Sequence, residues 1–529
     1  MSVDPYTALS GPARLHSVAD IAARSAARYP HKLAIVDGEV SLSFAELDRL
    51  IGTLAAWMQQ AGVHKGDRVL LFSHNCWQFP VAVLAAARIG AIAAPVNFML
   101  GPQELLYILQ LSQPALAIVE DGLRETFDAA LANYPGELAH KLLINLHGLP
   151  CSHGWQAFEP LVQGQHRAPL PVAVGAEEPI RMMFTSGTES LPKGVLLSSH
   201  ALLSQYVSCV VSGGMQVSDR EVHAFPLYHC AQLDNFLMTD IYLGATSYLL
   251  RRPDPAAILA TIERERISNL FCPPTAWIAL LNCPAFATAD LSSLKKVYYG
   301  ASAMPRTVIE TLRQKLPQIQ FWQFYGQTEM ASLATVLCPE DHEAYPGSVG
   351  VPALNVTTAV VDENDCPVDV GVVGEIVHRS PHLTLGYYAD LDKTAAAFRN
   401  GWFHSGDLGY FGESGHLYVV DRIKDIVKTG GENVSTKEVE EVIYDFDGVR
   451  EAAVFALPHP QWIEIVAAAV VAHDGHTLDT EALLRHCKAK LAGFKAPRFV
   501  AVVPVLPKNA SGKVLKRELR AAFQEAAGQ

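Results

Sequence analysis

Helix-like and strand-like segments alternate along the first half of this 529-residue chain. Between about residues 20 and 250, amphipathic stretches such as VADIAARSAARY alternate with short apolar runs such as RVLLFS, ALAIVED and KLLINL. Each run leaves through a polar turn. Such alternation is typical of strand–helix units, whose strands pair in parallel. The pattern therefore predicts an α/β fold, with parallel sheets covered by helices.

The texture of the sequence changes in its last third. The alternation returns in ISNLFCPP, LKKVYYGAS and FWQFYGQTE, and after about residue 349 it gives way to strands separated by Asn, Asp and Gly turns. This second texture predicts a small antiparallel sheet or barrel. After GHLYVVDRIKDIVK come a helix, two strands, another helix and a basic tail. We therefore predict an N-terminal domain over 1–421 and a C-terminal domain of ordinary size over 422–529.

Charge, cysteine content and apolar runs limit the classes of function. With 41 Lys and Arg against 54 Asp and Glu, the net charge is −13, so we expect neither nucleic acid nor an anionic membrane surface as a partner. The nine cysteines contain no CxxC pair, which argues against a zinc site or a disulfide framework and for a reducing compartment. The N-terminus does not read as a signal peptide. Arg88, Gly90 and Pro95 divide the longest apolar stretch into a buried helix and a strand, so we expect a cytoplasmic protein without a membrane span.

The stretch FTSGTESLPKG (184–194) joins two apolar runs through a turn rich in glycine and hydroxyl residues. Backbone N–H groups exposed by such a turn form a concave nest for anions, and Lys193 adds a mobile positive charge. The loop differs in spacing from G-x-x-x-x-G-K-[ST], and no hydroxyl residue follows Lys193. Composition alone favours a polyphosphate cradle over a plain surface turn.

Five further motifs follow this loop in order. They are YYGASAMP (298–305), QFYGQTEM (323–330), GWFHSGDLGY (401–410), DRIKDIVKTGGENVS (421–435) and PKNASGKVLKREL (507–519). Through these six motifs the chain resembles the adenylate-forming superfamily, which includes acyl-CoA synthetases, peptide-synthetase adenylation domains and beetle luciferases. The resemblance extends from about residue 17 to residue 519. It implies a large N-terminal body of two helix-covered sheets plus a small β-barrel, a mobile α+β C-terminal lid, and an active site between them.

The resemblance also implies ATP, magnesium and coenzyme A as cofactors and assigns residues to them. The nucleotide-binding set is Thr185, Ser186, Gly187, Thr188 and Lys193 at the β- and γ-phosphates, Gly300, Ala301 and Ser302 beside the adenine, Tyr325 on the base with Gly326 and Gln327 next to it, Thr328 at the α-phosphate, and Asp407 and Arg422 at the ribose. Glu329 is the implied magnesium ligand. Lys513 is the implied catalytic lysine, acting at the same centre as Thr328 and Glu329.

These residue types suit the activation of a carboxylic acid. A carboxylate is a poor electrophile and must become a mixed anhydride before a thiol can attack it. Its attack on the α-phosphorus brings two anions together, so positioning and fixed positive groups supply the catalysis. One well-placed donor of this sort contributes about 3–4 kcal/mol. Glu189 stands where the family loop commonly has glycine. A carboxylate there either points to solvent or reaches magnesium or a nearby arginine, and we expect it to point to solvent.

The motif KTGGENVSTKEVEEVI is typical of synthetases that pass the acyl group to coenzyme A. By resemblance, Lys424 is the hinge of the lid, and Gly430 and Gly431 let the pantetheine arm approach the backbone. For the acid pocket we predict Tyr228, His229, Leu233 and Tyr299, with Leu227, Phe236 and Trp277 either beside them or in the ordinary core. No cation faces the far end of the acid, and only Asp234 could hold an amine. Fatty or other hydrophobic monocarboxylic acids are the first prediction, and aryl acids the second.

Two other classes of function compete with this interpretation. A serine hydrolase would need G-x-S-x-G, but Met304 replaces the second glycine of GASAM. A non-catalytic nucleotide-binding relative is the other alternative, and the presence of Glu329, Asp407, Arg422 and Lys513 argues against it. The sequence leaves a homodimer open.

Overall fold

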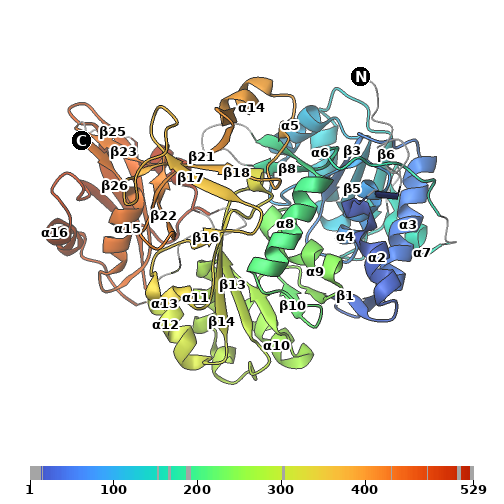
Figure 1. The fold of residues 1–529 in the computed structure, drawn as a ribbon, viewed down its shortest axis with the longest axis horizontal. Helices are drawn as coiled ribbons and strands as arrows, with labels where there is room; N and C mark the ends of the chain where they lie inside the picture. The colour runs from blue at the N-terminus through green and yellow to red at the C-terminus, as the bar shows by residue number, and fades with distance from the viewer. Residues whose placement is uncertain are drawn as a thin grey trace.

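The computed structural model describes residues 13–14, 16–151, 154–164, 168–185, 192–300, 304, 306–430, 432–473, 475–508 and 514–524. Two large mixed sheets and their helices make up most of this part of the chain, as Figure 1 shows. A smaller antiparallel sheet follows them, and a fourth sheet with its own helices lies at the C-terminal end. The α/β fold with a large N-terminal body and a further C-terminal unit is therefore confirmed.

The first sheet has nine strands, which run parallel from β1 to β14 and end in antiparallel strands on both sides. In spatial order they are β16 (Val351–Pro352), β15 (Thr335–Leu337), β14 (Gln320–Tyr325), β13 (Lys296–Gly300), β12 (Asn269–Phe271), β10 (Arg220–His223), β11 (Thr246–Leu249), β1 (Leu33–Asp37) and β2 (Val40–Ser43). Side chains from α10 (Pro255–Glu265), α11 (Pro274–Asn282) and α12 (Arg306–Lys315) pack against it in one core cluster. The carboxyl ends of its parallel strands carry two of the motifs.

The second sheet has eight strands with a parallel centre. In spatial order they are β19 (Gly386–Tyr387), β9 (Lys193–Ser198), β8 (Pro179–Thr185), β4 (Ile92–Pro95), β3 (Arg68–Phe72), β5 (Leu116–Glu120), β6 (His140–Ile144) and β7 (Gln156–Ala157). Strands β8 and β9 flank the glycine-rich loop and pair antiparallel, with Thr185 opposite Lys193. Both ends of that loop are thereby held on one sheet.

Helices between the two sheets join them into one body. A single core cluster contains side chains from both sheets and from the helices α2 (Ile21–Arg28), α3 (Phe44–Gln60), α4 (Gln78–Arg88), α8 (Ser199–Ser212) and α9 (Met238–Leu243). The other side of the second sheet is covered by α5 (Pro102–Ser112) and α6 (Arg124–Leu131). Helix α3 begins at a capping box in which Ser43 and Glu46 satisfy each other's backbone N–H groups. The longest apolar stretch divides as predicted, into α4 and β4.

Short helical elements complete the N-terminal part. They are η1 (Val18–Asp20), η2 (Asp121–Leu123), α7 (Phe158–Gln163), the π-helix η3 (Ala231–Leu237), η4 (Pro284–Ala287), η5 (Thr328–Met330), α13 (Asp341–Ala344) and α14 (Leu391–Ala397). Within the described residues, no helix has both the length and the apolar character needed to cross a membrane.

The third sheet is antiparallel and comprises β17 (Thr357–Val361), β18 (Gly374–Arg379), β21 (Trp402–Phe411), β20 (Phe398–Arg399) and β22 (Leu417–Arg422). Its described strands pair as a sheet, which is one of the two forms, sheet or barrel, that the sequence pattern predicted, whereas the resemblance implied the barrel. Its longest strand, β21, pairs with β22 and places Asp407 opposite Arg422. Two motifs far apart in the sequence thus meet on one pair of strands.

The fourth sheet begins four residues after β22. Its strands are β24 (Glu432–Val434), β23 (Val427–Thr429), β26 (Ile463–Ala472), β25 (Val449–His459) and β27 (Phe499–Val502). The helices that pack against it are α15 (Thr436–Tyr444), α16 (Thr480–Lys490) and α17 (Lys516–Phe523). The side chains on the two faces of this sheet belong to two separate core clusters. The predicted boundary near residue 422 falls at the connection between the third and fourth sheets, and the two-domain division remains our proposal.

Candidate active site

Glu329 and Lys193 both contact Tyr387. The Tyr387 hydroxyl donates to Glu329 Oε1 at 3.0 Å, and the Lys193 ammonium lies 4.8 Å from the centre of the same ring. Burial, and then the Glu329 carboxylate, raise the pKa of the Tyr387 hydroxyl well above its usual range, so it remains a donor. The Thr384 N–H also donates to the Glu329 carbonyl at 2.8 Å. The segment around Tyr387 therefore joins the lysine at the start of β9 to the glutamate in η5.

This arrangement suits a magnesium ion that is shared with phosphate. Glu329 supplies a half-buried carboxylate, a hard oxygen ligand. The described part of the chain has no group of three His, Cys, Asp or Glu side chains that could hold a metal ion by itself. Magnesium is usually bound by one or two carboxylates together with substrate phosphates. The residues present therefore fit an ion that arrives with the nucleotide.

A second cluster joins the end of β14 to the third sheet. The Tyr325 hydroxyl donates to Asp407 Oδ2 at 2.7 Å, and Arg422 Nε lies 3.2 Å from Asp407 Oδ1. Only 5% of the Asp407 surface is exposed. Burial, and then the neighbouring Asp407 carboxylate, raise the pKa of Tyr325 well above its usual value, so its hydroxyl stays protonated and donates. Three of the predicted nucleotide residues are therefore in direct contact.

The predicted acid segment lies against the predicted phosphate segment. The Cys230 thiol, between them, donates to the Thr328 hydroxyl at 3.4 Å. Burial raises the pKa of Cys230 to about 12, so it is a thiol and not a thiolate at neutral pH. Three buried side-chain atoms in these two segments have no hydrogen-bond partner within the described part of the chain, namely Tyr228 Oη, His229 Nε2 and Gln327 Nε2. Buried polar atoms are rarely left unpaired, so this concentration indicates a place where a ligand supplies the partners.

Tyr228 and His229 belong to an aromatic group. The Phe98 ring meets the Tyr228 ring edge to face at 5.2 Å, and His229 lies 4.6 Å from Tyr228. Phe98 in turn stacks on His74 at 3.9 Å. Burial lowers the pKa of His229 to about 4, so the imidazole is neutral at pH 7. Phe98, Tyr228 and His229 therefore form an aromatic wall, in which the Tyr228 hydroxyl and His229 Nε2 have no partner within the described residues.

Asn75 positions the backbone that leads into this wall. Its Nδ2 donates to the Phe225 carbonyl at 2.8 Å, and its Oδ1 accepts from the Leu227 N–H at 2.9 Å. The side chain is 1% exposed. Asn75 precedes α4, far away in the sequence, so no local pattern predicted its role.

Five predicted or considered pocket residues belong to the core clusters, namely Leu227, Leu233, Phe236, Trp277 and Tyr299. Leu233 is fully buried, in the cluster between the two large sheets, and its packing gives its pocket assignment no support. Tyr299 is 2% exposed and donates to Gln323 Oε1 at 3.2 Å, and Trp277 is also buried. Asp234, the only candidate for holding an amine, is fully buried. It accepts from Arg181 Nη1 at 3.0 and 3.1 Å and from the Tyr206 hydroxyl at 3.0 Å, so it is paired inside the body.

Two glycines allow a close approach of backbones at the predicted adenine side. A Cβ on Gly300 would lie 2.4 Å from the Phe324 carbonyl oxygen, in the neighbouring strand. A Cβ on Gly326 would lie 2.5 Å from the Ser332 carbonyl oxygen. Both positions therefore require glycine for packing, whatever ligand lies beside them.

The remaining predicted residues divide into described and undescribed ones. Lys424 is exposed in the connection between β22 and β23, and Gly430 has φ +59° with the Trp462 ring beside it. Thr185 lies at the end of β8. The predicted residues that lie outside the described part of the chain are Ser186, Gly187, Thr188, Glu189, Ala301, Ser302, Gly431 and Lys513.

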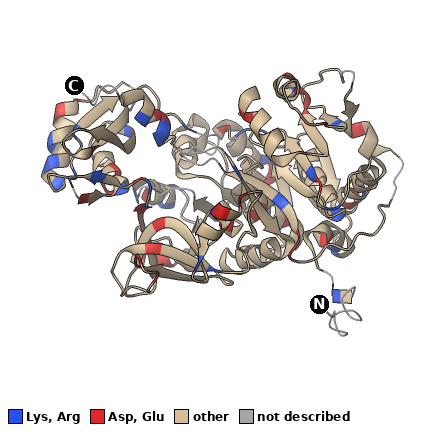
Figure 2. Ribbon diagram, turned by 90° about the horizontal axis from the view of Figure 1, so that it is seen from above, with Lys and Arg blue, Asp and Glu red and all other residues tan. Residues whose placement is uncertain are grey.

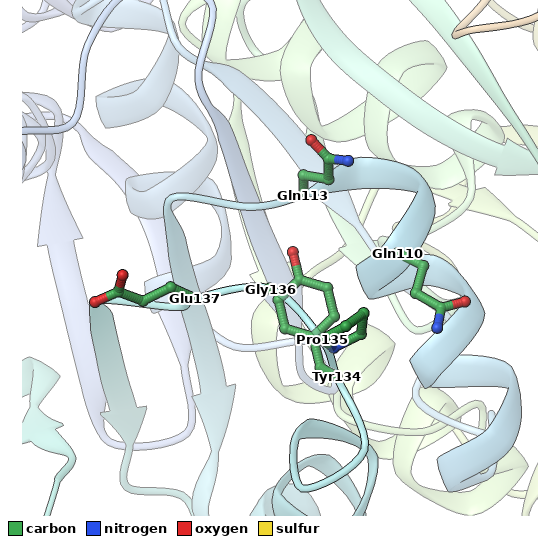
Figure 3. A pocket seen from close by; sticks show the side chains of 6 residues that line it. All are labelled: Gln110, Gln113, Tyr134, Pro135, Gly136 and Glu137. Atoms are coloured by element: carbon green, nitrogen blue, oxygen red, sulfur yellow. The ribbon is translucent and has the colours of Figure 1, made fainter.

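A hollow elsewhere on the body contains none of the predicted residues. It measures about 580 Å³ and lies between the end of α5 and the segment that follows α6 (Figure 3). Its lining is Gln110, Gln113, Tyr134, Pro135, Gly136 and Glu137. The motif-bearing segments are the candidate site instead, because Glu329, Lys193, Asp407 and Arg422 are brought together there through Tyr387 and Tyr325.

Comparison with known proteins agrees with this geometry. The family model described as AMP-binding enzyme matches residues 22–388, and the AMP-binding enzyme C-terminal domain matches residues 438–513. A feruloyl-CoA synthase of Amycolatopsis sp is 34% identical over 94% of this chain and 98% of its own length. A long-chain-fatty-acid–CoA ligase of Mycobacterium tuberculosis, FadD13, is 31% identical over 92% and 94%. The crystal structure of the anthranilate CoA ligase AuaEII with anthranoyl-AMP matches with a TM-score of 0.90, at 25% identity over 97% of this chain and 98% of that one.

The chain belongs to the AMP-binding, adenylate-forming enzyme family. Within it, the chain falls in the branch of acyl- and aryl-CoA ligases, which form an acyl-adenylate and use ATP, magnesium and coenzyme A.

Proposed function

We propose that this protein joins an aromatic monocarboxylic acid to coenzyme A. In the first step a carboxylate oxygen attacks the α-phosphorus of ATP, and pyrophosphate leaves. In the second, the thiol of coenzyme A attacks the acyl carbon, and AMP leaves. The observation that carries the choice of acid is the buried Tyr228 hydroxyl, which lies within an aromatic wall and has no hydrogen-bond partner among the described residues.

The nucleotide residues take the roles that the motifs assign to them. Asp407 accepts the ribose hydroxyls, oriented by Tyr325 and Arg422, which already contact its two oxygens. Thr328 meets the α-phosphate next to the Cys230 thiol. Lys193, with the loop that begins at Thr185, meets the outer phosphates. The short distances within each cluster support this assignment, because preorganised groups contribute most to phosphoryl transfer.

Glu329 is the protein ligand proposed for magnesium. The ion, when bound, neutralises charge on the phosphate oxygens and on the leaving pyrophosphate. Tyr387 fixes the carboxylate by donating to Oε1. Lys513 is proposed to place a further positive charge at the reacting centre, and Lys424 to be the point about which the lid turns between the two steps.

An aromatic acid explains the acid wall better than an alkyl chain does. A buried hydroxyl with no partner costs about 1–3 kcal/mol, and an alkyl chain offers it none. A substituent on an aromatic ring, such as a hydroxyl or methoxy group, offers the Tyr228 hydroxyl a hydrogen-bond acceptor. Phe98, Tyr228 and the neutral His229 supply flat apolar surface for the ring. This reverses the order of the sequence-based prediction, in which fatty acids came first.

The test compares acids that differ in one polar group. We expect kcat/KM for 4-hydroxycinnamate to exceed that for cinnamate by about tenfold or more, since a site built to pair a hydroxyl discriminates against its absence. In Tyr228→Phe the ratio of the two kcat/KM values should shrink to within about threefold, mainly because kcat/KM for 4-hydroxycinnamate falls. Release of pyrophosphate in the presence of ATP and coenzyme A provides the assay.

Straight-chain acids are the matched comparison. A wild-type enzyme that turned over octanoate or palmitate faster than every aromatic acid would contradict the proposal and restore the fatty-acid prediction. So would an unchanged preference in Tyr228→Phe. Tyr444→Phe, on a distant helix of the fourth-sheet unit, is a control for the loss of a tyrosine hydroxyl.

A further inference from the structure

One carboxylate of the third sheet lies at the N-terminus of the first helix of the fourth-sheet unit. Asp421 is in β22, and its Oδ2 accepts from the Thr436 N–H at 2.6 Å and from the Thr436 hydroxyl at 2.9 Å. The Ser435 hydroxyl donates to the same oxygen at 3.2 Å. Asp421 is 8% exposed and Thr436 is fully buried. A helix N-terminus favours a negative charge, so this is a strong, charge-assisted contact.

The contact joins two sheets that are linked by a short connection. β22 pairs with β21, with Leu408 opposite Asp421, so Asp421 moves with the third sheet. α15 packs on the fourth sheet through Val439 and Ile443. Only residues 423–426, which include Lys424, separate β22 from β23. A rotation of the fourth-sheet unit about this connection would therefore separate Asp421 from Thr436.

The same contact extends to the C-terminal tail. The Thr436 hydroxyl, which donates to Asp421, accepts from Lys516 Nζ at 2.7 Å. Lys516 Nζ also lies 2.9 Å from Glu440 Oε1, one turn further along α15. Lys516 begins α17 and stands three residues after Lys513 in the sequence. Asp421, Thr436 and Lys516 thus form a chain of polar contacts from the body to the tail that carries the predicted catalytic lysine.

We propose that Asp421 is a positioning residue, a latch that holds the C-terminal unit and its tail in the arrangement that forms the acyl-adenylate. The latch opens when the unit turns for transfer to coenzyme A. Neither the six motifs nor the family match assigns this role to Asp421. The inference rests on the proposed two-step function, because a latch between two arrangements matters only if both steps use the same lid.

The test measures the two steps separately in one variant. In Asp421→Ala we expect the single-turnover rate of acyl-adenylate formation to fall about tenfold or more. The rate of thioester formation from supplied acyl-adenylate should stay within about twofold of the wild type. The magnitude follows from the loss of a buried hydrogen-bond acceptor with charge. Asp421→Asn keeps the shape and loses the charge, so its effect should be smaller and of the same sign.

Two further variants separate a latch from general damage. Lys516→Met breaks the link to the tail and leaves the Asp421 contact with the helix, and it should also lower the first step selectively. Asp479→Ala removes an aspartate that caps α16 inside the same unit, and it should leave the ratio of the two rates unchanged.

Equal loss of both steps in Asp421→Ala, or an unchanged ratio in a folded Asp421→Asn and Lys516→Met, would overturn the latch. If the wild type formed no acyl-adenylate from any acid, the proposed function itself would fail. The two failures are thus distinguishable.

Discussion

Glu221, in β10, is a glutamate buried where no side chain or backbone group among the described residues pairs with its carboxyl group. It is 0% exposed, and neither carboxylate oxygen has a hydrogen-bond partner within the described residues. Burial, and then the negative charges of Asp240 and Asp219, raise its pKa well above the ordinary 4.5. The folded protein therefore holds Glu221 protonated at pH values where the unfolded chain releases the proton.

This protonation makes the stability depend on pH in a defined direction. Above pH 4.5 the folded state binds one more proton at Glu221 than the unfolded state, until the pH reaches the raised pKa. The contribution of Glu221 to stability is therefore complete below pH 4.5 and is lost as the pH rises, by up to about 1.36 kcal/mol per pH unit. Glu221→Gln removes this loss, so the free energy of unfolding of the variant, relative to that of the wild type, should rise between pH 5 and pH 8.

The measurement is urea unfolding of both proteins at pH 5, 6.5 and 8. A difference in the free energy of unfolding that stayed constant across the three values would show that Glu221 is ionised in the folded protein.

At the scale of residues, the motifs predicted correctly which nucleotide residues contact one another. They did not predict the neighbouring residues that orient them. Tyr325, Asp407 and Arg422 were assigned to one ligand and are in contact. Tyr387 and Asn75 lie outside the motifs, and Asp421 begins one of them without an assigned role, because each acts through partners that are distant in the sequence or carried by another element. Leu233, predicted for the acid pocket from its place next to a motif, lies in the core cluster between the two large sheets, and its pocket role remains a prediction.

At the scale of elements, β13 and β14 meet so closely at their ends that a side chain does not fit. Gly300 pairs with Phe324, and a Cβ at Gly300 would lie 2.4 Å from the Phe324 carbonyl oxygen. Gly300→Ala should force the two strands apart where the adenine and phosphate segments begin. We expect KM for ATP to rise about tenfold or more, because displacement of about 1 Å near a positioned reaction has large effects.

Gly493→Ala is the matched control, since a Cβ there meets nothing within 4 Å. Steady-state kinetics with ATP as the varied substrate provide the comparison. Equal KM values for the two variants would show that the end of β13 does not shape the nucleotide site.

Elements were predictable where one local pattern was strong. Arg88 and Gly90 separate the helix α4 from β4, and the sequence shows both breaks. The π-helix over Ala231–Leu237 was not predictable, because its backbone form follows from tertiary packing around Asp234 and Arg181. The order of the strands within each sheet could not be predicted from the sequence either, because paired strands such as β4 and β8 are far apart in the chain.

At the scale of the whole molecule, the two parts differ in charge. After Arg422 the chain has 14 Lys and Arg and 14 Asp and Glu, so the net charge of −13 belongs to the first 422 residues. Figure 2 shows acidic and basic residues interspersed in the lobe that contains the C-terminus. An acidic body does not attract ATP or coenzyme A from a distance. Binding therefore depends on local cations, of which Lys193 and Arg422 lie at the predicted nucleotide contacts.

The most direct test of the account is the stoichiometry of products from the purified protein. With ATP, magnesium, coenzyme A and 4-hydroxycinnamate, we predict one AMP and one pyrophosphate for each thioester formed, and an acyl-adenylate when coenzyme A is left out. Chromatography and mass spectrometry identify all four species. Formation of ADP and phosphate, or of thioester without any acyl-adenylate, would contradict the account.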